Sequence, residues 1–429
     1  MNASGLLQTA LNAGCLALAG LVLFVITARM PRLLLTLFLA QITLTSGAIG
    51  FYPSAVVSGV HIYLSDVFTV LLMVVGVSRK LHWRNWVRQD TLFTAFASLV
   101  IVGFLFSIPV FSLQSSINQT RQLFLSIAAY FWASSLGKWN ESLLEPFIWV
   151  ALVGATAQNF LYLRNGFGSA SDGYYDQALG GWVSARPLEA SGALILLCGF
   201  LVILSRSGQW TSSRFLMVIY LGLSVVLSQH RSVWIAALVS LLVLSAVAVK
   251  GSRTGVFALL PGLAAAIPIG LVAFLAVTNS SALINSAESS QTLDARFSIW
   301  SDRLAVDRSL LEWLTGGFVG PTPVQLDPSF QFEAHSMYVQ TLNTVGFVGL
   351  TILLATLVSV FPGFADAQRR TQSFMLIAVG VFGFFYTWPA WTFLLLGMSW
   401  GFREPADGRS ISNQQHQVRK RATRVSIAA

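Results

Sequence analysis

Residues 336–361 read SMYVQTLNTVGFVGLTILLATLVSVF and contain no charged side chain. An α-helix rises about 1.5 Å per residue, so this stretch is long enough to cross the roughly 30 Å hydrocarbon layer of a bilayer. It therefore predicts a membrane-spanning helix, and the rest of the chain can be examined for more stretches of the same kind.

Apolar runs of similar length recur along the whole chain. Of its 429 residues, 55% are hydrophobic and 10% are charged, whereas a soluble domain carries about 25% charged residues. The run from Ser373 to Phe402 is too long for one upright helix, and Trp388-Pro389 divides it into two short ones. We expect an all-α polytopic membrane protein with about 12 transmembrane helices (12–13), the remaining candidates being residues 6–27, 33–49, 61–77, 91–108, 117–136, 146–163, 187–205, 215–228, 232–249 and 254–277.

The basic residues indicate the orientation of these spans. If the spans cross the membrane alternately, 19 of the 26 lysines and arginines fall on one side, and cytoplasmic loops carry such an excess. The predicted organisation is one transmembrane domain over residues 1–402 and a basic, disordered cytoplasmic tail over residues 403–429. The tail has no aromatic residue and no nucleic-acid-binding motif, so the net charge of +9 indicates topology and attraction to anionic membrane lipids, not a nucleic-acid partner.

Every basic residue on the opposite, outer side is an arginine. Topology has no preference between lysine and arginine, but a planar guanidinium can hold two oxygens of a phosphate or a carboxylate at once. Ordinary ion pairing is the alternative, because Arg186 lies three residues before Glu189 and Arg303 four before Asp307. The outer arginines are Arg121, Arg164, Arg186, Arg231, Arg296, Arg303 and Arg308.

Two long polar segments are predicted on the outer side. The longer, residues 279–334, contains a predicted amphipathic helix within about residues 292–315, which would lie along the membrane surface. The shorter, residues 164–186, is rich in Gly and Ser. Its aromatic side chains can either bind the faces of sugars or anchor the loop as an interfacial belt; they are Tyr174, Tyr175 and Trp182.

Three outer positions are candidate site residues, each with an ordinary alternative. Arg231 lies in the shortest outer turn, between two spans, where its side chain is positioned for a ligand or extends to lipid phosphates. Arg296, in the predicted amphipathic helix, has the same two interpretations. His335 stands at the entrance of the span quoted above, either as a residue at the start of a helix or as a group with a chemical role.

The sequence His335-Ser336, nine residues and then Gly346-Phe-Val-Gly349 resembles the outer signature of bacterial O-antigen ligases and Wzy-type polymerases. Two further landmarks are similar to the family pattern: the turn from Ser228 to Arg231, and Arg296 followed by Trp300. Ser336 departs from that pattern, in which asparagine is more frequent. A Gly-x-x-Gly pair in a membrane helix can also serve only for close packing between helices.

The resemblance implies a GT-C-like, inverting glycosyltransferase that needs no metal ion and no cofactor. Its donor would be an undecaprenyl-diphosphate-linked oligosaccharide, and its acceptor lipid A-core in a ligase or a lipid-linked repeat unit in a polymerase. The reaction would take place at the outer face of the bacterial plasma membrane, with the C-terminus in the cytoplasm. For a polymerase, a chain-length regulator would be a further partner.

The residues can be assigned roles in that reaction. The leaving diphosphate gains negative charge, which fixed guanidinium groups stabilise, so Arg231 and Arg296 are the catalytic candidates, with Arg186 and Arg303 as further ligands. A neutral imidazole can accept a proton near neutral pH, so His335 is the candidate for activating the acceptor hydroxyl. The candidates for binding the substrate glycan are Tyr174, Tyr175, Trp182 and Ser336.

Two other classes of function are compatible with many spans and outer arginines. A lipid-linked glycan flippase or exporter without transferase activity would place charged residues in the middle of the membrane, and the predicted spans contain almost none. A sensor or scaffold would use the large loop to bind a partner. No internal repeat is visible in the sequence, which disfavours a transporter built from inverted repeats.

Overall fold

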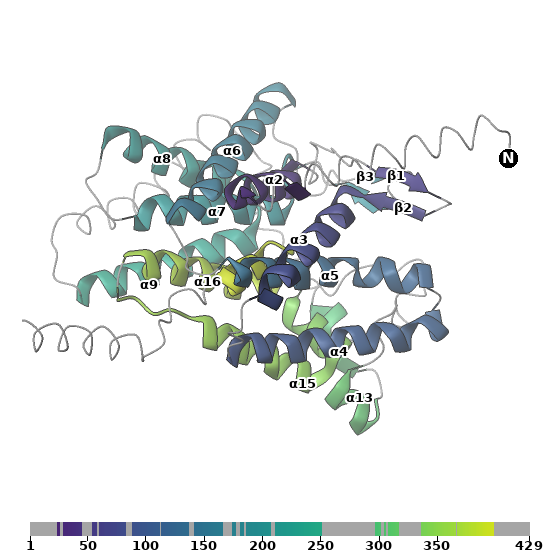
Figure 1. Cartoon of the computed structure of the whole chain (residues 1–429). Helices are drawn as coiled ribbons and strands as arrows, with labels where there is room; N and C mark the ends of the chain where they lie inside the picture. Colours follow the sequence, from purple (N-terminus) through teal and green to yellow (C-terminus); the bar gives the residue numbers. More distant parts are fainter. Residues whose placement is uncertain are drawn as a thin grey trace, which may run out of the picture.

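The computed structural model is a bundle of apolar helices (Figure 1) and describes most of the chain between residues 24 and 398. The described residues are 24–25, 29–44, 54–57, 60–82, 88–111, 113–136, 141–165, 174–176, 181–183, 186–206, 211–250, 297–301, 304–305, 308–316, 336–365 and 367–398.

The long apolar runs form helices where the sequence predicts them. The described helices are α2 (Pro31–Leu44), α3 (Leu64–His82), α4 (Arg88–Phe111), α5 (Leu113–Ser135), α6 (Glu145–Asn165), α7 (Ala190–Ser205), α8 (Ser212–Leu227), α9 (Arg231–Lys250), α13 (Leu310–Thr315), α15 (Met337–Val360), α16 (Ala367–Phe385) and α17 (Thr392–Met398), with a 3₁₀ turn η2 (Glu141–Leu143). The predicted interruption at Trp388-Pro389 is present, because α16 ends at Phe385 and α17 begins at Thr392.

Three of the described helices are long and apolar enough to cross a membrane: residues Gln89–Pro109, Glu145–Arg164 and Met337–Val360. Four shorter apolar helices accompany them: residues Pro31–Leu44, Ala190–Ser205, Ser212–Leu227 and Arg231–Val247. These helices confirm the prediction of a membrane protein. The total of about 12 spans stays a prediction, and the candidate spans at 6–27 and 254–277 lie almost entirely outside the described residues.

Two short antiparallel hairpins accompany the predicted helices. β1 (Ser54–Val57) pairs with β2 (Val60–Tyr63), so the span expected from residue 61 begins as a strand. β3 (Tyr174–Asp176) pairs with β4 (Gly181–Val183) inside the shorter outer segment. A helix of only a few residues leaves most of its backbone amides and carbonyls without partners and is unstable. Two paired strands of the same length bond these groups to each other.

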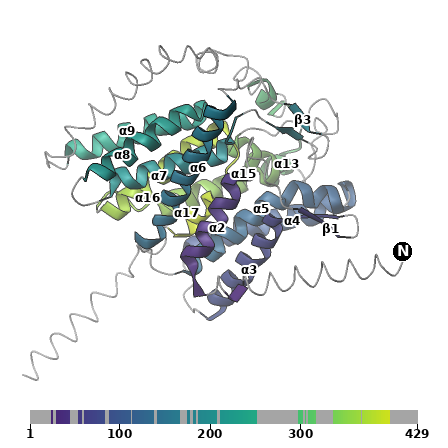
Figure 2. The same cartoon turned by 90° about the horizontal axis from the view of Figure 1, so that it is seen from above.

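The helices form two groups, as Figure 2 shows from above. Helices α6 to α9 lie on one side and α3 to α5 on the other; α16 packs against α7 and α9, α15 against α4, and α17 against α5. The helix α7 is deeply enclosed: 14 of its 16 residues are buried, and it packs against α2, α6, α8, α9 and α16. The uniformly apolar sequence of α7 suits this position, because a helix that is apolar on all sides has no polar face to expose.

Glycines allow several of these helices to approach closely. Gly76 on α3 faces the backbone of α5, and a Cβ atom there would lie 2.7 Å from the amide nitrogen of Trp132. Gly199 on α7 faces α6, where a Cβ atom would lie 2.8 Å from the carbonyl oxygen of Phe147. Small residues at helix contacts are typical of membrane bundles, in which packing takes the place of the hydrophobic effect between helices.

Gly76→Ala tests this contact. The added methyl group has backbone as its neighbour, which cannot rotate away, so we expect a destabilisation of about 1–3 kcal/mol and a lower thermal transition of the purified protein. The matched control is Gly380→Ala on α16, where the nearest atom to an added Cβ is the Tyr338 hydroxyl at 3.9 Å. Equal transitions for the two variants would show that α3 and α5 are not in close contact at Gly76.

Candidate functional site

The turn between α8 and α9 holds Arg231 in a fixed position. Gln229 adopts a left-handed backbone conformation with φ 58°, which is uncommon for a residue other than glycine. The Ser228 hydroxyl donates to the Val225 carbonyl at 2.7 Å, and the indole of Trp234 donates to the Val225 and Val226 carbonyls at 3.1 Å each. These bonds satisfy the last carbonyls of α8. Arg231, half-buried, is the first residue of α9.

His230, in the same turn, connects α9 to the segment that precedes α7. Its Nδ1 lies 3.0 Å from Nη1 of Arg186, and its Nε2 lies 2.9 Å from the carbonyl oxygen of Leu188. An arginine can only donate hydrogen bonds, so Nδ1 is the acceptor. The imidazole is therefore neutral, with its proton on Nε2 directed at Leu188. The ring is 3% exposed, so this arrangement is sequestered from water.

Arg186 has further partners within the protein. It interacts electrostatically with Glu189, three residues later, and with the Tyr162 hydroxyl on α6. Arg186 and Glu189 thus attract each other, but among the described residues no ion pair joins the two side chains. Since a guanidinium has five N–H groups, these contacts position the side chain without excluding a ligand.

Ser336 of the signature is connected to this turn by residues at the end of α16. The rings of His230 and Tyr386 meet edge to face with centroids 6.5 Å apart, and the Tyr386 carbonyl accepts from the amide of Met337 at 3.1 Å. The Ser336 hydroxyl accepts from the Val339 amide at 3.4 Å and donates to the Gly383 carbonyl at 3.3 Å. Ser336 is 2% exposed. These contacts make it the N-cap of α15, a position that favours serine.

The structure thus brings two of the predicted arginines, Arg186 and Arg231, onto neighbouring segments beside the start of α15. Sequence analysis missed His230 and Tyr386, which connect these segments. His230 stood beside Arg231 in the quoted turn and could have been selected from that position, whereas Tyr386 gave no signal.

The remaining predicted residues cannot be placed in the same detail. Arg296, Arg303 and His335 lie outside the described residues. For the aromatic residues of the shorter loop only the backbone is described: Tyr174 is paired with Val183, and Tyr175 with Trp182.

Two other outer arginines have structural roles. Nε of Arg121 on α5 lies 2.9 Å from Oδ1 of Asp66 on α3, and the guanidinium lies over the ring of Tyr63 at 4.6 Å. Arg308 donates to the Asn343 side-chain oxygen at 2.9 Å and lies 5.2 Å from the ring of Trp313. Arg121 joins α3 to α5, and Arg308 joins the large outer segment to α15.

Residues 308–309 are not helical, so the stretch predicted as one amphipathic helix is divided. Residues 297–301 and 304–305 are helical, and α13 starts anew at Leu310. Ser309 and Glu312 form a capping box, in which each side chain bonds the backbone amide of the other. The Glu312 carboxylate accepts hydrogen bonds from the Ser309 amide and from the Ser309 hydroxyl, and these two bonds lower the pKa of Glu312. The division follows because a serine followed three residues later by glutamate favours the start of a helix.

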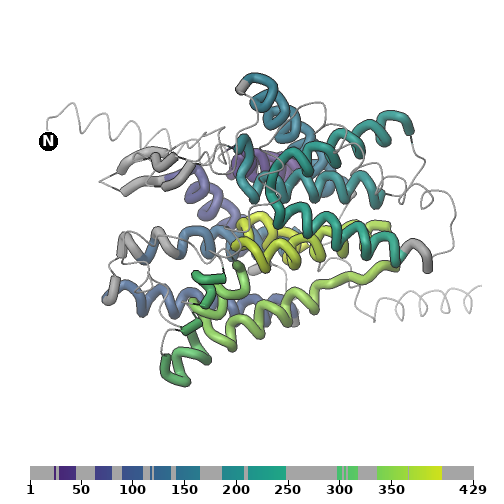
Figure 3. The backbone as a smooth tube through the Cα atoms, turned by 180° about the vertical axis from the view of Figure 1, so that it is seen from behind, coloured from purple at the N-terminus to yellow at the C-terminus, as the bar shows by residue number. Residues whose placement is uncertain are grey.

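Gly346, the first glycine of the signature, is in contact with the end of α13. Gly346 breaks α15 with φ 66° and ψ −169°, a conformation essentially confined to glycine. A Cβ atom on Gly346 would overlap the Leu314 carbonyl oxygen and the Gly316 amide nitrogen, and one on Gly316, with φ 85°, would overlap the Thr344 carbonyl oxygen. The end of α13 and the break in α15 are therefore in backbone-to-backbone contact (Figure 3).

An aromatic contact completes this joint, since the rings of Trp313 and Phe347 lie 5.7 Å apart. Gly346 consequently connects α15 to the large outer segment and does not join two spans. Gly349 has a different neighbour, the side chain of Val345 in its own helix.

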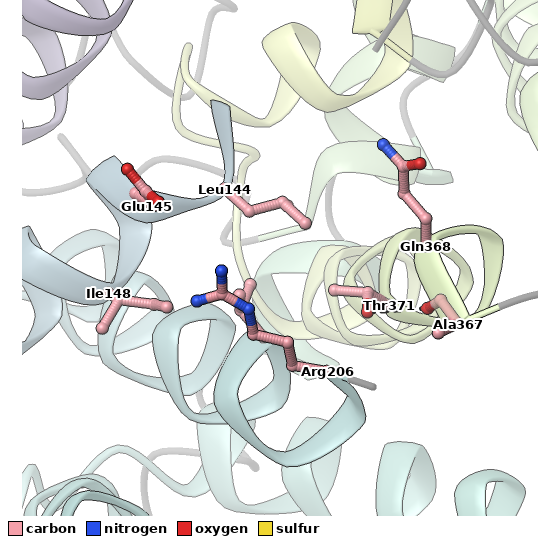
Figure 4. Close-up of a pocket in the computed structure, with 8 residues that line it drawn as sticks. Leu144, Glu145, Ile148, Arg206, Ala367, Gln368 and Thr371 are labelled. Carbon is pink, nitrogen blue, oxygen red and sulfur yellow. Dashed lines mark hydrogen bonds between the residues drawn. The ribbon is translucent and has the colours of Figure 1, made fainter. Parts of the chain in front are cut away.

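A small hollow lies at the first residues of α6 and α16 and the end of α7 (Figure 4). The guanidinium of Arg206 extends there toward Ile148 and Glu145. None of the predicted site residues lines this hollow, and it is separate from the turn at Arg231. Among the described residues, no group of three or more His, Cys, Asp or Glu side chains is arranged to hold a metal ion.

Gly346→Ala tests the joint between α13 and α15. Both the backbone strain, about 1–3 kcal/mol, and the overlap with α13 should destabilise the protein and expose the outer segment to limited proteolysis. Gly363→Ala is the control, because Gly363 has φ 76° but nothing within 4 Å of an added Cβ, so it introduces strain alone. Similar proteolysis of both variants would contradict the joint.

Comparison with known proteins supports the signature. Residues 215–354 match the sequence profile of the O-antigen ligase family. The match covers about a third of the chain and includes α8, the turn at Arg231, α9, α13 and the broken part of α15. No curated protein matches the chain. The resemblance inferred from the sequence is confirmed over residues 215–354, which are similar to the O-antigen ligase family.

Proposed function

We propose that the protein is a glycosyltransferase that uses polyprenyl-diphosphate-linked glycan, of the undecaprenyl type, at the outer face of the bacterial plasma membrane. The observation that carries this proposal is the rigid α8–α9 turn, which holds Arg231 at the start of α9 and, through His230, the guanidinium of Arg186. The family implies glycosyl transfer in general. The lipid-linked donor and its site follow from the chemistry of these two arginines.

The lengths of the helices suit a donor whose tail stays in the bilayer. Helices α7 and α8 have 16 residues each and are therefore about 24 Å long, which is less than the roughly 30 Å of hydrocarbon. With their shared connection at the cytoplasmic side, their other ends would lie below the outer headgroups. Arg186 and Arg231 would then be at the depth where the diphosphate of a polyprenyl lipid meets the hydrocarbon.

The reaction requires positive charge at this position. The acceptor hydroxyl oxygen forms a bond to the anomeric carbon, and the bond from that carbon to the phosphate oxygen breaks. The lipid diphosphate leaves with the bonding electrons and gains negative charge. Guanidinium groups that are already fixed stabilise this charge without reorganisation. We assign the diphosphate to Arg231 and Arg186, with Arg296 and Arg303 completing the site from the large outer segment.

His335 is proposed to accept the proton of the acceptor hydroxyl. It directly precedes Ser336, whose hydroxyl and neighbouring amide are fixed to α16 by the bonds to Gly383 and Tyr386. Ser336 lies close to the turn that carries Arg231, because Tyr386 bonds the amide of Met337 and its ring contacts that of His230. Tyr174, Tyr175 and Trp182 are proposed to contact the glycan.

Substitution of Arg231 tests the diphosphate site. Arg231→Lys keeps the charge but loses the two-pronged geometry, and hydrogen bonds to charged groups contribute about 1.5–3 kcal/mol each. We expect initial rates of transfer from lipid-linked donor to fall by about 10- to 100-fold, with unchanged yield of folded protein. Arg164→Lys, at the exposed end of α6, is the matched control. If protein yield falls together with activity, Arg231 is structural.

A second experiment tests transfer itself. Purified protein in vesicles is supplied with donor and either lipid A-core or a second lipid-linked repeat, and the products are separated by size. Wild type should couple glycan to one acceptor, which distinguishes ligase from polymerase, and His335→Ala should bind donor but not couple it. The transferase proposal fails if wild-type protein moves glycan across the vesicle membrane and leaves the donor uncoupled.

A further inference from the structure

Resting on the proposed function, we infer that His230 is a positioning residue that sets Arg186 relative to Arg231, so that both guanidinium groups reach one diphosphate. The two arginines are 45 positions apart and belong to different segments. His230 precedes Arg231 in the chain and holds Arg186 through space at 3.0 Å. His230 therefore connects the Arg186 side chain to the backbone from which Arg231 extends.

The segment that carries Arg186 needs such a connection. Residues 186–188 form bends before α7 begins at Ala190, so no helix fixes their side chains. His230 bonds this segment twice, at the Arg186 guanidinium and at the Leu188 carbonyl. The ring itself is buried, and its backbone carbonyl accepts from the amides of Val233 and Trp234 at 3.0 Å each. The buried His230 thus holds the irregular segment that contains Arg186.

The two bonds of the imidazole can be separated by substitution. In asparagine a polar atom stands three bonds from Cα, as Nδ1 does in histidine, so His230→Asn can keep the acceptor for Arg186 while it loses the donor to Leu188. In glutamine the polar atoms stand four bonds from Cα, as Nε2 does, so His230→Gln can keep the donor to Leu188 while it loses the acceptor for Arg186. A role confined to holding the backbone predicts that glutamine is the better substitute, and positioning of Arg186 predicts asparagine.

The experiment measures kcat and the KM for the lipid-linked donor with the full-length protein. We expect His230→Asn to keep the donor KM close to that of wild type. We expect His230→Gln to raise it about 10- to 100-fold, the effect of losing a hydrogen bond to a charged group. The reverse order of the two variants would overturn the inference.

A double-mutant cycle gives an independent measure. If His230 acts through Arg186, His230→Gln should cause no further loss in a protein that already carries Arg186→Gln. Additive losses would show that His230 acts by another route and would overturn the inference. If His230→Gln does not fold, the asparagine variant decides alone: a folded His230→Asn protein with a strongly raised donor KM contradicts the positioning role.

The outcomes also separate this inference from the proposed function. If the wild-type protein transfers no glycan, the function is wrong. If it transfers glycan and the variants do not follow the expected order, only the role of His230 is wrong. Binding of the lipid-linked donor, measured without acceptor, should show the same order and does not depend on turnover.

Discussion

Backbone amides and carbonyls inside a hydrocarbon layer have no water to bond, and this constraint governs every irregular point in the bundle. The α8–α9 turn satisfies it with the Ser228 hydroxyl and the Trp234 indole, which bond the final carbonyls of α8. The start of α15 satisfies it with Ser336 and the Tyr386 carbonyl. Because the Ser228 and Trp234 side chains bond the backbone of α8, the turn is held in one conformation. Such a turn can hold an arginine at one depth in the membrane.

The arginines predicted on the outer side fall into two kinds. Arg121 and Arg308 have side-chain partners that join one element to another, Asp66 in the first case and Asn343 in the second. Arg186 and Arg231 lie on adjoining segments at the ends of short helices. The predicted excess of arginine over lysine on this side therefore has one observed source, contacts that join elements, and one proposed source, anion binding.

Sequence reasoning located the helices because an apolar run of membrane length has few other structures available. The run at 187–205 became α7, and the break at Trp388-Pro389 separates α16 from α17. It did not find the hairpins, since runs of three or four residues carry too little periodicity, and the span expected at residue 61 began as a strand. The bonds of His230 to Arg186 and Leu188 join positions 44 and 42 residues apart, a relation that no local pattern contains. The break at Gly346 was equally hidden, because its cause, the end of α13, lies in another part of the chain.

The joint between Gly316 and Gly346 consists of backbone against backbone. Such a joint requires glycine at two positions and does not depend on most other side chains. Exposed residues of the outer segment, such as Leu310 and Leu311, can therefore change without disturbing its attachment. A surface attached in this way can diverge quickly while its anchor stays constant. If the protein transfers glycan as proposed above, we expect related chains to differ more in the outer segment than in the membrane bundle and its arginines.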